Sequence, residues 1–148
     1  MTIPFLGLHM IVKDGAATIK TLLNSIDGVF DEVVFVDTGS SDDTRKIISE
    51  HYNVPWDRPG RIVREVEAGD VFPRVILATF DWIDDFSAAR QFSYELGSAK
   101  WRGYLDADDD ASCFKSRLRP TLERTDRDFP NVNCISIGYR YTTDGGMV

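Results

Sequence analysis

The stretch that decides the fold is residues 31–44, which are DEVVFVDTGSSDDT. Its first part contains an apolar, β-branched run, Val33–Val36, which is typical of a strand buried on both faces of a sheet. The run ends at Asp37, and the polar residues after it are typical of a helix start, because Ser40 and Asp43 stand at capping-box spacing. The stretch therefore predicts a buried strand that turns directly into a helix.

Strands and helices alternate on both sides of this stretch. Before it, the pattern predicts a buried strand within residues 3–12 and a helix with its apolar face at residues 19–26. After it, the predicted elements are a strand at 61–66, a helix at 86–96, a strand at 101–105, a short helix at 114–118 limited by Pro120, a strand at 132–141 and a hairpin at 143–146. Residues 69–79 carry no clear pattern. The alternation predicts an α/β fold with a mostly parallel central sheet and helices on both faces.

The composition is that of an ordinary globular domain. The chain has 148 residues, 24 acidic and 17 basic side chains, and a net charge of −7, so we expect one domain that binds no nucleic acid. No apolar run approaches the roughly 20 residues of a transmembrane helix, and the start lacks a signal-peptide pattern. The two cysteines, Cys113 and Cys134, are expected to be reduced, buried thiols in a cytoplasmic protein.

Four carboxylates in five residues follow the strand predicted at 101–105. Residues 106–110 are DADDD, and a cation is the direct way to relieve their mutual repulsion. Hard oxygen ligands suit Mg²⁺ or Mn²⁺, which usually bind through one or two carboxylates together with a substrate phosphate. The alternative is a solvated acidic turn. The position at the carboxyl end of a strand, where α/β sheets bind their ligands, favours the metal site.

Three other interpretations of the polar clusters fail on spacing or context. An EF-hand loop that started at Asp106 would need Gly and Glu where the sequence has Ala111 and Arg117. A zinc site is not expected, because the histidines and cysteines have no ligand spacing. The segment 37–39 is similar to an aspartic protease motif, but that fold is all-β, whereas strands and helices alternate here.

Four segments, in this order along the chain, resemble motifs of the family 2 glycosyltransferases with the GT-A fold. They are HMIVKD at 9–14, the stretch 31–44, WIDDFSAARQ at 82–91 and YLDADD at 104–109. The resemblance covers roughly residues 6–110. It implies a Rossmann-like GT-A sandwich for a single domain spanning residues 1–148, which we expect to be the donor-binding part of a longer enzyme.

The resemblance implies transfer of a sugar from a nucleotide-sugar donor, such as a UDP-sugar, to an acceptor hydroxyl. It places Asp14 and Asp37 around the base and ribose, and Arg90 toward the nucleotide or its phosphates. It places Asp106 on the ribose and sugar side and makes Asp108 the ligand of a divalent cation, Mn²⁺ or Mg²⁺. Such a cation stabilises the charge that develops on a leaving diphosphate.

The catalytic base and the acceptor stay unassigned at this point. Inverting members of the family use a carboxylate as general base, but no carboxylate after Asp110 lies in a motif that assigns this role. A donor-binding domain without transfer activity is therefore the alternative to a complete enzyme. A nucleotidyltransferase also uses paired aspartates with Mg²⁺, but it needs a glycine-rich, basic phosphate loop that residues 13–15 do not supply.

Overall fold

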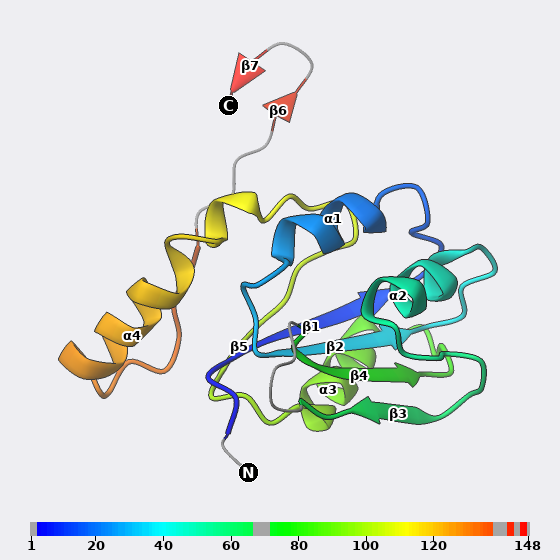
Figure 1. Cartoon of the computed structure of the whole chain (residues 1–148), viewed down its shortest axis with the longest axis horizontal. Helices are drawn as coiled ribbons and strands as arrows, with labels where there is room; N and C mark the ends of the chain where they lie inside the picture. Colours follow the sequence, from blue (N-terminus) through cyan, green and yellow to red (C-terminus); the bar gives the residue numbers. More distant parts are fainter. Residues whose placement is uncertain (1–2, 67–71, 138–141, 144–145, 148) are drawn as a thin grey trace.

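A five-stranded sheet forms the centre of the protein, with the strand order β3-β4-β2-β1-β5 (Figure 1). The structure is a computed structural model, and it describes residues 3–66, 72–137, 142–143 and 146–147. The strands of this sheet are β1 (Leu6–Val12), β2 (Glu32–Asp37), β3 (Arg61–Arg64), β4 (Arg74–Thr79) and β5 (Trp101–Gly103). Strands β4, β2, β1 and β5 are parallel, and β3 is antiparallel to β4. The predicted α/β class and its mostly parallel sheet are confirmed.

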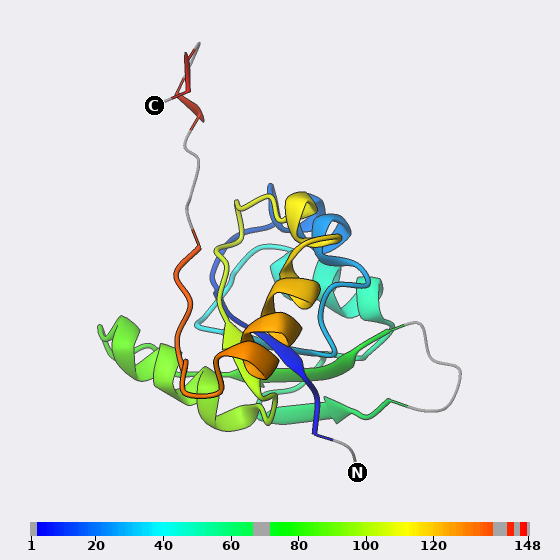
Figure 2. The same cartoon turned by 90° about the vertical axis from the view of Figure 1, so that its left-hand side faces the viewer.

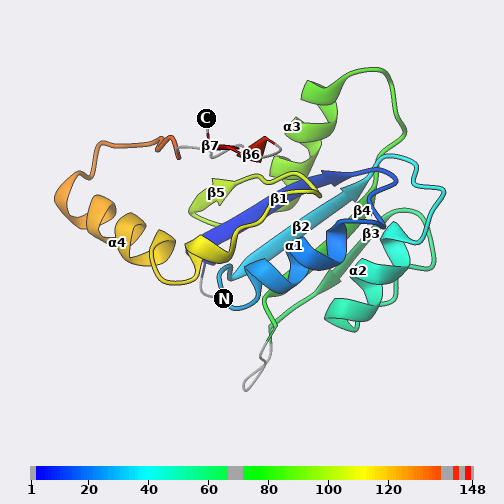
Figure 3. The same ribbon diagram turned by 90° about the horizontal axis from the view of Figure 1, so that it is seen from above.

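Helices cover both faces of this sheet, as predicted. Helices α1 (Ile19–Ile26) and α2 (Thr44–Tyr52) lie on one face, and α3 (Phe86–Leu96) lies on the other (Figures 2 and 3). Strand β2 serves both layers, since Val33 and Phe35 belong to the larger core cluster and Val34 and Val36 to the cluster beneath α3. This double burial explains why the apolar run in β2 does not alternate with polar residues.

The chain after β5 extends the larger core beyond the edge of the sheet. It contains a short 3₁₀ helix, η1 (Ser112–Phe114), helix α4 (Leu118–Asp128) and two short antiparallel strands, β6 (Thr142–Thr143) and β7 (Gly146–Met147). Leu122 of α4 is buried in the core cluster, and the indole nitrogen of Trp101 donates a hydrogen bond to Asp126 at 3.1 Å. The antiparallel pairing of β6 with β7 confirms the predicted hairpin. The contacts of Leu122 and Asp126 hold α4 beside β5, which forms one side of the sheet.

Several predicted boundaries after β5 were wrong. Pro120 does not limit a helix but lies in the first turn of α4, where the missing proline N–H has no intrahelical partner to lose. The strand predicted at 132–141 is not found over residues 132–137, most of which are exposed and pair with no neighbouring strand; residues 138–141 lie outside the described part. Both cysteines are exposed rather than buried, because they lie in these peripheral segments.

Two predictions earlier in the chain also need correction. Ser40 does not cap the second helix, because α2 begins only at Thr44 and no side chain caps its start. The segment 69–79, to which no element was assigned, contains β4, an interior strand whose Val75–Ala78 are all buried. Residues 67–71, which precede β4, lie outside the described part.

Within the described residues, no helix is long and apolar enough to cross a membrane.

A buried carboxylate joins the start of β2 to the segment between α3 and β5. Glu32 is fully buried and accepts hydrogen bonds from Arg74 Nη1 at 2.6 Å, from Ser98 N at 2.7 Å and from Ala99 N at 3.0 Å. Burial opposes ionisation of Glu32, but these donors outweigh it and hold the pKa of the carboxyl below its usual range. The close approach depends on Gly97, where an added Cβ would lie 2.7 Å from Glu32 Oε1 and 2.4 Å from His9 Cε1.

Replacing this glycine tests the packing between α3 and the sheet. We expect Gly97→Ala to lower the free energy of unfolding by about 1–3 kcal/mol, because the new methyl group would overlap buried atoms. Urea denaturation measures the change. Gly103→Ala is the matched control, since a Cβ there would meet nothing within 4 Å. Equal stability of the two variants would contradict the packing.

Candidate functional site

The polar clusters predicted from the sequence lie where the parallel strands β1, β2 and β5 end. We call this row of strand ends the C-terminal edge of the sheet. In the register of β1 and β2, Val12 is paired with Asp37, so the loops that leave these strands start side by side. Strand β5 pairs with the other side of β1, and the acidic residues 106–110 follow it. Figure 3 shows β1 and β2 running to the same edge. Such an edge is the usual ligand site of an open α/β sheet.

The loops after β1 and β2 are hydrogen-bonded to each other through Asp14. Its Oδ1 accepts hydrogen bonds from Ser41 N at 2.7 Å, from Ser41 Oγ at 3.1 Å and from Asp42 N at 3.3 Å. In return, Asp14 N donates to Ser40 Oγ at 3.0 Å. The hydrogen bond from the Ser41 N–H is the main cause that holds the pKa of the Asp14 carboxyl below its usual range. Asp14 therefore positions the second loop.

Asp42 makes the reciprocal contacts toward the first loop. Its Oδ2 accepts from Ala16 N at 3.0 Å, its Oδ1 accepts from Thr44 N at 2.9 Å, and Gly15 N donates to Thr44 Oγ1 at 2.8 Å. The Thr44 hydroxyl is the main cause of a lowered pKa at Asp42. The prediction missed Asp42 and Thr44, although a short polar segment rich in Ser, Thr and Asp is a signal for such loop contacts. We call residues 13–16 and 37–44 together the loop pair.

Asp37 lies at the end of β2, at the edge where it was predicted. Its side chain is buried; Oδ2 accepts from Gly39 N at 3.3 Å, and both oxygens lie 3.2 Å from Ser40 N, which donates to them. Gly39 has a φ of +106°, a conformation that favours glycine. The carboxylate thus shapes the turn from which the second loop starts, and its predicted contact with base or ribose stays a prediction.

Arg90 and Asp106 lie close together, although Arg90 comes from α3 and Asp106 from the turn after β5. Arg90 lies on α3, and its Nη2 is 3.7 Å from Asp106 Oδ1. Its Nη1 donates to the carbonyl oxygen of His9 at 2.9 Å, and its guanidinium carbon lies 4.3 Å from the centre of the Tyr104 ring. The guanidinium is therefore fixed on three sides beside the acidic turn, and its charge offsets part of the negative charge there.

The acidic turn is folded by one of its own carboxylates. Asp109 Oδ2 accepts from Asp106 N at 2.7 Å, and Asp109 N donates to Asp106 O at 3.1 Å. Burial raises the pKa of Asp109, and the neighbouring charges of Asp106 and Asp108 act in the same direction. The side chains of Asp106 and Asp108 are exposed, so their oxygens are accessible to a ligand.

A divalent cation fits this turn only with help from a ligand. Among the described residues, no group of three or more His, Cys, Asp or Glu side chains is placed to hold a metal ion. Mg²⁺ in particular is commonly bound by one or two carboxylates and completes its shell with substrate phosphates and water. Two exposed carboxylates on a fixed turn, Asp106 and Asp108, match that donor set. The predicted ligand role of Asp108 stays a prediction.

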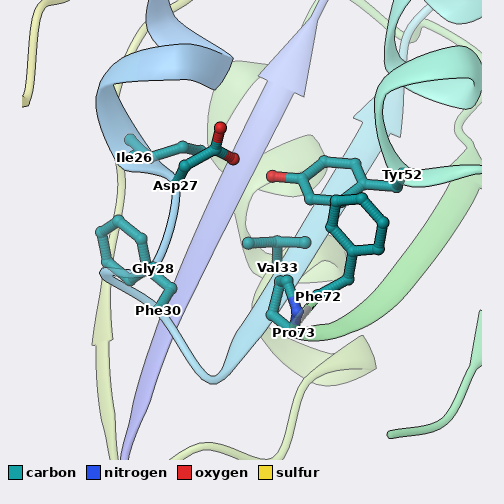
Figure 4. A pocket seen from close by; sticks show the side chains of 8 residues that line it. All are labelled: Ile26, Asp27, Gly28, Phe30, Val33, Tyr52, Phe72 and Pro73. Carbon is teal, nitrogen blue, oxygen red and sulfur yellow. The ribbon is translucent and has the colours of Figure 1, made fainter. Parts of the chain in front are cut away.

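A separate cavity of about 240 Å³ lies at the opposite edge of the sheet (Figure 4). It opens between the ends of α1 and α2, and its apolar walls include Phe30 and Val33. The hydroxyl of Tyr52 and the carboxylate of Asp27 face each other there, and burial raises the pKa of Tyr52. Val33 is near the start of β2, whereas Asp37 ends it, so this cavity is distinct from the loop pair and the acidic turn.

The lowered pKa of Asp14 predicts how the loop pair responds to acid. A carboxyl whose pKa is lower in the folded state stabilises the fold above its unfolded pKa, and this contribution is lost as the pH falls through the folded value. We expect Asp14→Asn to be less stable than the wild type at pH 7, and the difference to shrink as the pH falls below 3.8, the ordinary value. Urea denaturation from pH 7 to about 2.5 measures this difference.

Asp43→Asn is the matched control for this experiment. Asp43 is exposed in the same segment and makes no capping hydrogen bond, so its replacement should leave the stability unchanged at both ends of the pH range. A stability loss in Asp14→Asn that stays constant over the whole pH range would show that ionisation of Asp14 does not hold the loop pair together.

Comparison with known proteins gives these features a family. The chain is 34% identical over 104 residues to a TPR repeat-containing protein of Synechococcus elongatus, which covers 70% of this chain and 20% of that protein. It is 29% identical over 138 residues to the SPbeta prophage-derived glycosyltransferase SunS of Bacillus subtilis, which covers 92% of this chain and 27% of that protein. The chain thus spans about a fifth to a quarter of the length of these relatives.

The family comparison covers nearly the whole chain, including the loop pair, Arg90 and the acidic turn. Residues 12–147 match the family described as "Glycosyl transferase family 2". The resemblance seen in the four sequence motifs is confirmed, and the α/β structure with its mostly parallel sheet agrees with the GT-A fold that this family implies. The chain belongs to glycosyl transferase family 2.

Proposed function

We propose that this chain binds a nucleotide-sugar, with Mn²⁺ or Mg²⁺, as the donor part of an inverting glycosyltransferase. The observation that carries the proposal is the convergence of Arg90 and Asp106 at the edge where the loop pair also lies. Strand β1 separates β2 from β5, so the axes of β2 and β5 are roughly 10 Å apart, which is two strand spacings. Between them, Gly15 of the loop pair lies next to Ala107 of the acidic turn, because an added Cβ at Gly15 would be 3.1 Å from Ala107 Cβ. An extended nucleoside diphosphate can span the distance between the two strands.

Each part of the edge suits one part of the donor. The loop pair offers Asp37 and a fixed turn for the base and ribose, and Arg90 offers a preorganised cation for the diphosphate. Arg90 is needed there because the chain as a whole carries a charge of −7, which repels a diphosphate. Asp106 would face the ribose and sugar, and Asp108 would hold the cation.

The transfer step needs groups that the described residues do not assign. An acceptor hydroxyl would attack the anomeric carbon, a carboxylate would take its proton, and the nucleoside diphosphate would leave with the electron pair of the glycosidic bond. A bound divalent cation would neutralise the charge on that leaving group. A UDP-hexose as donor, a hydroxyl acceptor and a cytoplasmic location complete the proposal.

Titration with nucleotides tests whether metal and donor bind together. We expect Mn²⁺ to raise the affinity for UDP, GDP, ADP or CDP by about 5- to 150-fold, because protein carboxylates and phosphate oxygens share the coordination shell. Coupling is reciprocal, so the nucleotide should raise the affinity for Mn²⁺ by the same factor. Asp108→Asn should abolish the enhancement without loss of folding. Isothermal titration calorimetry measures both effects. It is carried out with the nucleoside diphosphate that binds most tightly and then with a nucleotide-sugar that carries the same nucleotide.

Asp110→Asn is the matched control for Asp108→Asn. Asp110 belongs to the same acidic turn, but its Oδ1 accepts from Ser112 N at 2.8 Å, and an asparagine can keep this bond. The control should retain the coupling between metal and nucleotide. Nucleotide binding that is independent of metal, or coupling that persists in Asp108→Asn, would refute the metal assignment and favour a solvated acidic turn.

Asp37→Ala tests the base-and-ribose end of the site. Hydrogen bonds to a charged group contribute about 1.5–3 kcal/mol, so loss of the carboxylate should weaken nucleotide binding by about 10- to 150-fold. Ser40→Ala is the control, because it removes the hydroxyl that accepts from Asp14 N and leaves the carboxylate in place. Unchanged nucleotide affinity in Asp37→Ala would leave this residue with only its role in the turn.

A further inference from the structure

His9 is a buried histidine on the interior strand β1, and the proposed donor site does not use it. It lies in β1, its side chain is fully buried, and its Nδ1 is 2.8 Å from the carbonyl oxygen of Ser93 on α3. A carbonyl oxygen can only accept, so Nδ1 must carry the proton in this hydrogen bond. Burial is the main cause that lowers the pKa of His9, which keeps the ring neutral with one proton to donate.

The imidazole contacts the last part of α3 and the residue that follows the helix. The His9 ring lies 4.8 Å from the Tyr94 ring, measured between centres, in a tilted arrangement. Beyond the end of the helix, Gly97 leaves room for the ring, since a Cβ there would come within 2.4 Å of His9 Cε1. The hydrogen bond to Ser93, the ring contact and this close approach together fix α3 against β1, both along the helix axis and in rotation.

The same histidine also contacts Arg90 directly, through its main chain. The carbonyl oxygen of His9 accepts from Arg90 Nη1 at 2.9 Å. Arg90 precedes Ser93 by one helical turn, and Ser93 Oγ donates to the carbonyl oxygen of Arg90 at 2.7 Å. The side chain of His9 therefore holds the helix turn from which Arg90 projects, while its backbone holds the guanidinium. This geometry leaves Arg90 Nη2 beside Asp106.

We propose that His9 is a positioning residue of the donor site. It anchors α3 and thereby fixes the Arg90 guanidinium in the position from which it binds the diphosphate. This inference rests on the proposed function and deepens it. An arginine side chain that is free in solution loses considerable rotamer freedom when it binds a phosphate. An arginine that the fold already holds loses less, so anchoring α3 strengthens nucleotide binding without any contact between His9 and the nucleotide.

Two substitutions with the same number of heavy side-chain atoms separate the hydrogen bond from simple packing. Asparagine places its amide nitrogen near the position of His9 Nδ1 and can still donate to Ser93, whereas leucine has the same branched shape and no donor. Both variants lose the outer part of the ring and leave a similar gap. His9→Leu should therefore release α3, and His9→Asn should retain much of the anchor.

A double-mutant cycle with Arg90→Ala tests whether His9 acts through Arg90. The readout is the dissociation constant of the nucleoside diphosphate that the wild type binds most tightly with Mn²⁺. We expect His9→Leu to weaken this binding by about fivefold or more in the wild-type background and by less than about twofold in the Arg90→Ala background. In the background that retains Arg90, His9→Asn should keep most of the wild-type affinity for the nucleoside diphosphate. Amide hydrogen exchange of residues 88–96 without nucleotide should be faster in His9→Leu than in His9→Asn.

The outcomes distinguish this inference from the proposed function. Equal losses of affinity from His9→Leu in both backgrounds, or equal losses from His9→Leu and His9→Asn, would overturn the positioning role. Wild-type affinity in Arg90→Ala would remove the phosphate role of Arg90 and this inference with it, while nucleotide binding by the wild type would still support the donor site. No nucleotide binding by the wild type would refute the proposed function, and the exchange rates would then decide whether His9 anchors α3.

Discussion

The parallel pairing of β1 with β2 on one side and β5 on the other is the constraint on which the rest of the structure depends. It brings the loop after β1, the turn at Asp37 and the acidic turn after β5 to one edge, although they are far apart in the sequence. It also places β1 and β2 in the middle of the sheet, where both of their faces are buried. The hydrophobic effect that stabilises the fold therefore also assembles the candidate site.

The two sides of this edge are held by different kinds of contact. Exposed carboxylates, Asp14 and Asp42, join the loop pair by accepting backbone N–H groups, so its geometry is sensitive to their ionisation. On the other side, α3 packs against the sheet through the buried His9 ring and the close approach at Gly97, and these contacts are shielded from solvent. Acid should therefore weaken the contacts within the loop pair, whereas the close packing at Gly97 does not depend on the ionisation of an exposed carboxylate.

Long apolar patterns were predicted well, and short or tertiary contacts were not. The strands β1, β2 and β5 follow from local residue types, and the structure confirms them; β2 extends one residue further at each end than predicted, and β5 ends two residues earlier. The interior strand β4 was missed, because its apolar residues follow a segment of mixed polarity that gives no strand signal. The strand predicted at 132–141 had suitable residues over 132–137, but these meet no sheet edge to pair with.

The sequence by itself determined the α/β class and the family, and it placed Asp37 at the end of a strand, Arg90 on a helix and the acidic turn after β5, because strand ends and ordered motifs are local features of the chain. Only the tertiary structure decided that Asp14 is bound to the neighbouring loop, that Arg90 contacts Asp106 and His9, and that β3 is antiparallel. The physical reason is that hydrogen bonds and charge contacts between distant segments depend on strand order and register, which the packing of the whole chain fixes at once.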